Sequence, residues 1–458
     1  MFGTTELPRV GRRWLAALAP ALLMTLLMTL LIAGCGGGAG ARLERGLEQE
    51  ARGEPLQAAL SYISALERDG TLDEARARLE DLAPTLSQVW EGRIANFQQA
   101  GDALGAGEQT LTLQEILVRS PGVGVPVSPP PNWPQHRASI LTGANEASLR
   151  RSREEGSDGR WSEGIQILRT ALERYEPSPR HEATMHELWT SHLVSWGEAE
   201  LADGRPRAGF LRLEEAHARL TPGDPLLRRI SNLQAQALEM GSIRVAFLPL
   251  DATERARELA PAGFPEALNE LLQLERWTVP PPFVLTASPV DVRRELDRVR
   301  REATRRSQVT PATDAAVDVG RAVGAQRTVI TEVEAFVWDT SGVRIQERAA
   351  TLQGGGNTVY RVRTGTVRMA ATVGFLVVDP SSRRTVDQRS FTIRTSAPLE
   401  EGIYAGNPDV LDLSNRDRLL FTPSQQAARE AEAVEELQDL LAERLAEELF
   451  GRLVASVP

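Results

Sequence analysis

The single cysteine is the residue of this chain with the clearest chemical potential. Cys35 follows an apolar run over 14–33, and Arg9, Arg12 and Arg13 lie ahead of that run. A basic segment, an apolar segment and a small-residue cleavage site make up a secretory signal sequence. The layout predicts export and cleavage before Cys35, which places its thiol at the new N-terminus. The alternatives are a buried structural thiol and an uncleaved membrane anchor, since the run is close to the length that spans a bilayer.

The residues around Cys35 resemble the lipobox of bacterial lipoproteins, in which one branched aliphatic and two small residues precede an acylated cysteine. Here those three residues are Ile32, Ala33 and Gly34. The resemblance implies a signal peptide over 1–34, a lipidated Cys35, and a Gly-rich tether over 35–41. Because Gly36 rather than Asp follows the cysteine, the resemblance also implies anchoring in the outer membrane, facing the periplasm. Each buried methylene of the acyl chains contributes about 0.8 kcal/mol to anchoring.

Composition excludes several classes of chemistry. The chain has 458 residues, a formal net charge of -10, and no lysine, so that all 52 basic residues are arginine. Phosphate-loop and Schiff-base mechanisms need a lysine, and cysteine metal sites need more than one cysteine. An acidic, exported chain is also a poor partner for nucleic acid. We therefore expect no cofactor.

The histidines do not have the spacing of a metal site. His181 and His186 are five residues apart, and His186 and His192 are six apart. The zinc motif H-E-x-x-H needs a separation of four, which places both rings on one helix face. No histidine occurs after residue 240, and the paired Glu332 and Glu334 are explained by exposure on one strand face. The sequence thus predicts neither a metal site nor an enzyme.

The segment 42–240 has a helical pattern with three similar stretches. In each, a glycine is followed five positions later by a small residue and then by apolar residues at helical spacing. The stretches cover 53–66, 159–172 and 204–216. They resemble tetratricopeptide repeats, and the alternative is a plain bundle of helical hairpins. A Pro-rich segment over 121–134 cannot be helical, and we expect a linker or extended arm whose Trp133 packs back onto the helices.

The segment 241–458 alternates between strand and helix patterns. Turn residues at 339–342, 354–357 and 379–382 indicate that the later strands form an antiparallel meander. The expected strands are 243–250, 282–286, 327–338, 344–352, 359–378 and 385–395, and the expected helices are 264–276, 289–306, 313–324 and 424–454. The sequence thus predicts an α+β multidomain chain, with a helical-hairpin domain followed by an α/β domain that has a mixed, largely antiparallel sheet.

The order of these elements resembles one family of envelope lipoproteins. The strand Val245-Ala-Phe-Leu-Pro-Leu250, the strand Phe283-Val-Leu-Thr286 and the segment 320–331 carry the resemblance. It is a resemblance to the α/β domain of the curli-secretion lipoprotein and of the penicillin-binding-protein-activator lipoproteins. The family implies two roles, a subunit of an oligomeric secretion pore or an adaptor for envelope proteins. Alternation over 367–377 fits a pore hairpin, and it fits a half-buried strand equally well.

We expect a non-enzymatic adaptor or assembly factor for envelope proteins, and the sequence does not name its partner. The alternative is a subunit of a secretion pore. A homo-oligomer is compatible with both roles. Repeat helices form concave binding surfaces, and arginine clusters steer acidic partners. The candidate binding residues are His192 and Glu200 on the helical domain and Arg361, Arg363 and Arg368 on the long strand.

Overall fold

The computed structural model describes residues 38–306 and 311–458. The expected signal peptide, the lipobox residues Ile32, Ala33 and Gly34, and Cys35 lie outside the described residues. The fold is α+β, with many helices in the N-terminal region and one mixed sheet of seven strands in the described part of the chain. Among the described helices, none combines the length and the apolar content needed to cross a bilayer.

The chain divides into two compact units between Trp196 and Gly197. The first unit is helical, and the first described helix begins at Ala39, inside the expected tether 35–41, because Ala39 and Ala41 favour a helix once Gly38 is passed. The elements of this unit are α2 (Ala39–Ala51), α3 (Pro55–Leu66), α4 (Asp73–Leu82), α5 (Leu86–Gln99), α6 (Ala103–Arg119), η1 (Ser120–Val123), α7 (Trp133–Ser157) and α8 (Trp161–Arg174), and α9 (Pro179–Ala202) crosses the division.

The three repeated stretches adopt the same local geometry. Gly53, Gly159 and Gly204 each have a φ between 73° and 77°, a left-handed conformation that ends one helix and allows the chain to turn into the next. The small residue five positions later then lies in close contact with the preceding helix. At Gly164, for example, a Cβ would lie 3.0 Å from the carbonyl oxygen of Ser152. The expected glycine turns are therefore confirmed.

The Pro-rich segment is an extended arm that packs on the helices. Val125 and Val127 are buried in the core of α3–α6, and the Ser87 hydroxyl donates a hydrogen bond to the Ser128 carbonyl at 2.6 Å. Trp133 contacts Trp90 edge-on, with ring centroids 5.2 Å apart. The expectation that Trp133 returns to the helices is confirmed.

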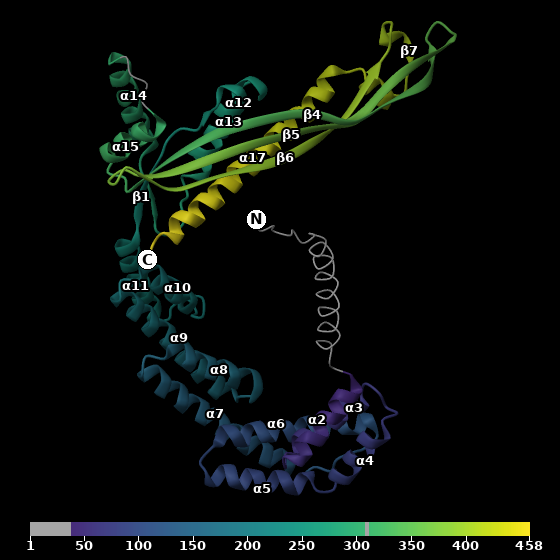
Figure 1. Cartoon of the computed structure of the whole chain (residues 1–458), viewed down its shortest axis with the longest axis vertical. Helices are drawn as coiled ribbons and strands as arrows, with labels where there is room; N and C mark the ends of the chain where they lie inside the picture. Colours follow the sequence, from purple (N-terminus) through teal and green to yellow (C-terminus); the bar gives the residue numbers. More distant parts are fainter. Residues whose placement is uncertain (1–37, 307–310) are drawn as a thin grey trace, which may run out of the picture. The chain divides into compact units, whose positions relative to one another are not determined.

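The second unit places two helices before an α/β layer (Figure 1). Its elements are α10 (Pro206–His217), α11 (Leu226–Gly241), β1 (Ile243–Phe247), β2 (Asp251–Ala252), α12 (Glu254–Leu259), α13 (Phe264–Leu271), the π-helical turn η2 (Leu272–Arg276), β3 (Val284–Thr286), α14 (Pro289–Arg305), α15 (Ala312–Ala322), β4 (Arg327–Leu352), β5 (Asn357–Asp379), β6 (Arg384–Ile403), η3 (Pro408–Val410), β7 (Leu411–Asp412), α16 (Asn415–Leu419) and α17 (Pro423–Ala455). The strand order is β3-β1-β4-β5-β6, with β2 and β7 paired to β4.

Helices α10 and α11, which the sequence places in the helical segment 42–240, pack on the α/β layer. The Phe210 ring meets Phe283 edge-on at 5.3 Å. A Cβ at Gly241 would lie 2.8 Å from Pro206 Cγ and 2.9 Å from the Phe283 ring. These contacts make the two helices part of the second unit.

Two strands expected on either side of a turn at 339–342 form one continuous strand, so that expectation is wrong. Asp339 pairs with Arg368 and Arg344 pairs with Thr364, and both pairs belong to the same antiparallel ladder of β4 and β5. Gly342, with φ +64°, lies in a bulge where the register shifts. Because β5 offers partners on both sides of this segment, the extra residues are absorbed as a bulge and the chain does not reverse.

Helix α17 lies along one face of β4, β5 and β6 (Figure 1), and its expected apolar stripe is confirmed for four of five leucines. The four leucines buried against the sheet are Leu437, Leu441, Leu445 and Leu449. Leu440 is 38% exposed. The antiparallel pairing of β4, β5 and β6 is also confirmed, while β1 pairs in parallel with β3 and β4.

Candidate functional site

The residues predicted to bind a partner do not come together. His192 is buried, and its Nε2 lies 2.9 Å from the Ser152 hydroxyl. Burial lowers the pKa of the His192 imidazole, which favours the neutral ring. Its prediction as an exposed groove residue is wrong, because its ring fills the space that Gly156 and Gly164 leave open between the helices.

Glu200 is also poorly placed for a partner. Its side chain is 13% exposed, and its carboxylate accepts a hydrogen bond from Arg205 just beyond the turn at Gly204. The ion pair closes the turn between α9 and α10. The expectation that Glu200 is an exposed contact residue is therefore wrong.

On β5, Arg361 and Arg368 are exposed and Arg363 is partly exposed. Arg361 and Arg363 take part in ion pairs across the sheet. Arg361 donates to Glu347 at 3.1 Å, and Arg363 lies 3.6 Å from Glu401. Arg368 is exposed and pairs in register with Asp339. Exposed pairs of this kind contribute about 0–1 kcal/mol to stability. Arg361 and Arg363 are therefore explained as parts of a solvated, ion-paired sheet surface.

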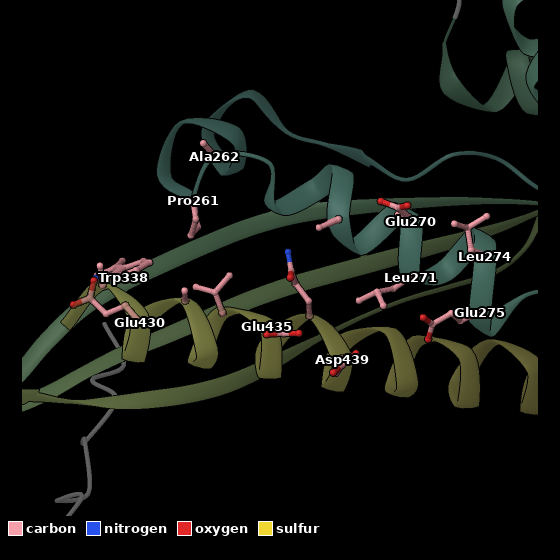
Figure 2. A pocket seen from close by; sticks show the side chains of 15 residues that line it. Pro261, Ala262, Glu270, Leu271, Leu274, Glu275, Trp338, Glu430, Glu435 and Asp439 are labelled. Carbon is pink, nitrogen blue, oxygen red and sulfur yellow. The ribbon is translucent and has the colours of Figure 1, made fainter. Parts of the chain in front are cut away.

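A different surface has the form of a binding site, and it lies between α13 with η2 on one side and α17 on the other. It is a groove with a volume of about 740 Å³. Figure 2 shows α17 along one wall, Leu271 and Leu274 on the opposite wall, and Trp338 of β4 at one end. We call this surface the α17 groove.

The α17 groove has apolar and small residues along both walls. Ala427, Ala431, Val434 and Gln438 recur at intervals of three and four residues on α17, so they share one helix face. This stripe lies beside the leucines that pack on the sheet. On the other wall Leu274 is 64% exposed, and Trp338 at the end is 41% exposed. Large apolar side chains in such an open, concave surface are typical of an interaction site.

The α17 groove is also acidic. Five carboxylates line it, and no arginine or histidine does among the described residues; the five are Glu270, Glu275, Glu430, Glu435 and Asp439. Within the described part of the chain, none of the five takes part in an ion pair. Glu430 accepts a hydrogen bond from the Gln426 amide at 2.8 Å. Figure 2 shows Glu435 and Asp439 on α17 and Glu270 and Glu275 on the opposite wall.

The sequence carries a weak signal for this groove in the small residues of α17. The apolar pattern of α17 predicts one leucine stripe, whereas Ala427, Ala431 and Val434 form a second, weaker one. Small residues give little hydrophobic signal, and the opposite wall comes from residues more than 150 positions earlier in the chain. Only the pairing of α13 with α17 brings the two walls together.

The described residues hold no group of three or more His, Cys, Asp or Glu side chains arranged for a metal ion. Glu332 and Glu334 lie on β4, and burial together with the nearby Asp251 raises the pKa of Glu332. Glu334 covers Gly374 of β5.

The comparisons with known proteins give no family for this chain. No protein-family model matches it, and no curated protein sequence matches it. Among solved structures, the hypothetical protein CT253 from Chlamydia trachomatis is 14% identical. The match covers 45% of this chain and 96% of that chain with a TM-score of 0.22, which supports no conclusion about fold or function.

Proposed function

We propose that this chain is a non-enzymatic lipoprotein of the outer membrane, anchored through Cys35 and acting as an adaptor or assembly factor for envelope proteins. The localisation rests on the lipobox-like residues Ile32, Ala33 and Gly34 and on Gly36. The finer fold assignment, tetratricopeptide-like helix pairs followed by a domain of the curli-secretion type, belongs to the same proposal. The recurrent glycine turns at Gly53, Gly159 and Gly204 support its first part.

The observation that carries the adaptor role is the burial of the alternating strand. Six residues of β5 form its apolar face, namely Val367, Met369, Ala371, Val373, Phe375 and Val377, and each is no more than 3% exposed. They belong to the same hydrophobic core as the leucines of α17. A pore hairpin would present such a face to lipid. Here the domain's own helix covers the face, which favours a folded domain that works through its surface.

The test of this proposal compares solubility with membrane attachment. Cys35→Ser should abolish incorporation of labelled palmitate and either release the chain from membranes or leave it unprocessed. The released chain should remain monodisperse in buffer without detergent, because the apolar face of β5 is covered. Detergent-dependent rings with ion conductance in planar bilayers would replace the adaptor with the pore subunit. Equal palmitate labelling of the variant and the wild type would remove the lipoprotein assignment.

A further inference from the structure

We propose that the α17 groove binds one amphipathic helix of a partner protein, a helix with a single apolar stripe flanked by arginine or lysine. This inference rests on the proposed adaptor function and specifies the chemistry of its partner.

The apolar walls determine the shape of the occupant. Both walls are helical, and Ala427 and Ala431 are small enough to let another backbone approach closely. The stripe on α17 has the spacing of three and four residues that accepts the ridges of a packed helix. Between Ala427 and Asp439 the wall extends for roughly three turns, about 18 Å at 1.5 Å per residue. A helix of about 12 to 14 residues therefore matches the length of the groove.

The rim determines the charge of the occupant. Carboxylates stand on both walls, with Glu435 and Asp439 on α17 and Glu270 and Glu275 opposite (Figure 2). Within the described residues these four have no basic partner. A bound helix with cations on both flanks of its apolar stripe would supply one. An acidic helix would place like charges together, so the rim also selects against such partners.

The most basic helix that a second copy would offer within the described residues does not match the groove. The most basic described helix is α14, and its apolar residues Val292, Leu296 and Val299 are buried in its own domain. Several of its arginines are already paired, including Arg298 with Glu295 at 2.7 Å and with Glu302 at 2.9 Å. Because α14 has no free apolar stripe, it does not fit the groove, which favours a helix of another protein as the occupant.

The first test uses a synthetic 14-residue helical peptide with leucines on one stripe and arginines on both flanks. Its affinity for the mature full-length chain carrying Cys35→Ser is measured by fluorescence anisotropy. The double variant Glu435→Arg/Asp439→Arg should weaken binding at least ten-fold, and Leu274→Glu should weaken it by a similar factor. The affinity should also fall as salt is raised, because exposed charges are screened. Circular dichroism and thermal melting check that the variants are folded, which we expect because the substituted side chains are exposed.

A matched control separates the groove from net charge. Glu436→Arg/Glu443→Arg makes the same charge change on α17, at exposed positions outside the groove, and should leave affinity within about two-fold. The proposal is overturned if this control weakens binding as much as the groove variant does. It is also overturned if the peptide does not bind, if a peptide with glutamates in place of the arginines binds equally well, or if the groove variant abolishes self-association of the chain instead.

A second test distinguishes failure of the groove from failure of the adaptor function. The wild type and the groove double variant are compared as baits in envelope extracts. If the variant recovers the same partner in the same amount, the groove proposal fails and the adaptor function stands. If the wild type recovers no specific partner, the adaptor function fails and the groove loses its biological occupant. The groove proposal and the adaptor function are both supported if the wild type recovers a partner that the groove variant loses. A basic helix of that partner should then compete with the peptide.

Discussion

Helix α17 has two stripes of opposite character. The first contains Leu437, Leu441, Leu445 and Leu449, all fully buried against the sheet. The second contains Ala427, Ala431 and Val434, which line an open groove whose acids have no basic partner among the described residues. The same helix therefore holds the domain together on one side and leaves an unfilled surface on the other.

The difference between the two stripes shows how one helix can stabilise the domain with one face and offer another face to a partner. Truncating a leucine of the first, buried stripe should lower the free energy of unfolding most, because these side chains are packed inside the folded chain. Ala427 and Ala431 of the groove stripe are exposed and contribute little to the folded chain, so their identity is free to serve a partner, whereas Val434 also packs partly against the core. Unpaired carboxylates are tolerated there because water solvates them until the groove is occupied.

The largest expected change in the free energy of unfolding comes from the buried leucine stripe of α17. Leu441→Ala should lower the free energy of unfolding by about 2–5 kcal/mol, because it leaves a cavity between α17 and the sheet. The adjacent Leu440→Ala is the matched control and should change stability by about 0.5 kcal/mol or less, since Leu440 is partly exposed. Urea unfolding measures both. Equal losses would mean that Leu440 and Leu441 do not differ in burial as described.

The close contact between α7 and α8 tests whether tight packing contributes equally to the stability of the helical unit. Gly164→Val should cost about 1–3 kcal/mol, because its Cβ would press on the Ser152 carbonyl and on the His192 ring. Gly143→Val is the control, since a Cβ at Gly143 meets nothing within 4 Å. Thermal or urea unfolding of the two variants should separate them clearly, and similar stabilities would argue against the tight helix pair.

A smaller effect is expected where a polar group joins α17 to the sheet. The buried Thr395 hydroxyl donates to the Ala433 carbonyl at 3.0 Å. Thr395→Val keeps the shape and removes the donor, so it should cost about 1 kcal/mol. Thr392→Val, an exposed position on the same strand, serves as the comparison in urea unfolding and should cost less. A larger loss at the exposed site would contradict the burial described for β6.

The smallest effect is expected in the groove, and it has the opposite sign. Glu435→Gln/Asp439→Asn removes two like charges at i and i+4, so the free chain should gain a few tenths of a kcal/mol. The gain should shrink in high salt. Unfolding at low and high ionic strength measures it. A clear destabilisation would show that these carboxylates have a structural role, and the comparison between the two stripes would no longer hold.

Periodicity predicted the elements of the second unit well and their connections less well. The closing helix, expected over 424–454, occupies Pro423–Ala455, and the helix expected over 289–306 occupies Pro289–Arg305. The turn at 339–342 failed because turn residues also occur in bulges, and only the partner strand distinguishes the two. His192 failed because a polar side chain on a helix gives no sign of which neighbour will bury it.

The sequence by itself determined the helix pairs, the antiparallel meander and the leucine stripe, because each depends on residues within one or two turns or strands of one another. It also determined the charge of the chain and its lack of lysine. Only the tertiary structure decided which layer α10 and α11 pack on and which polar residues are buried. It also decided that Leu274, Trp338 and the alanines of α17 share a groove. Those properties depend on contacts between segments that are distant in the sequence, and the pattern of one element does not show which distant segment it will contact.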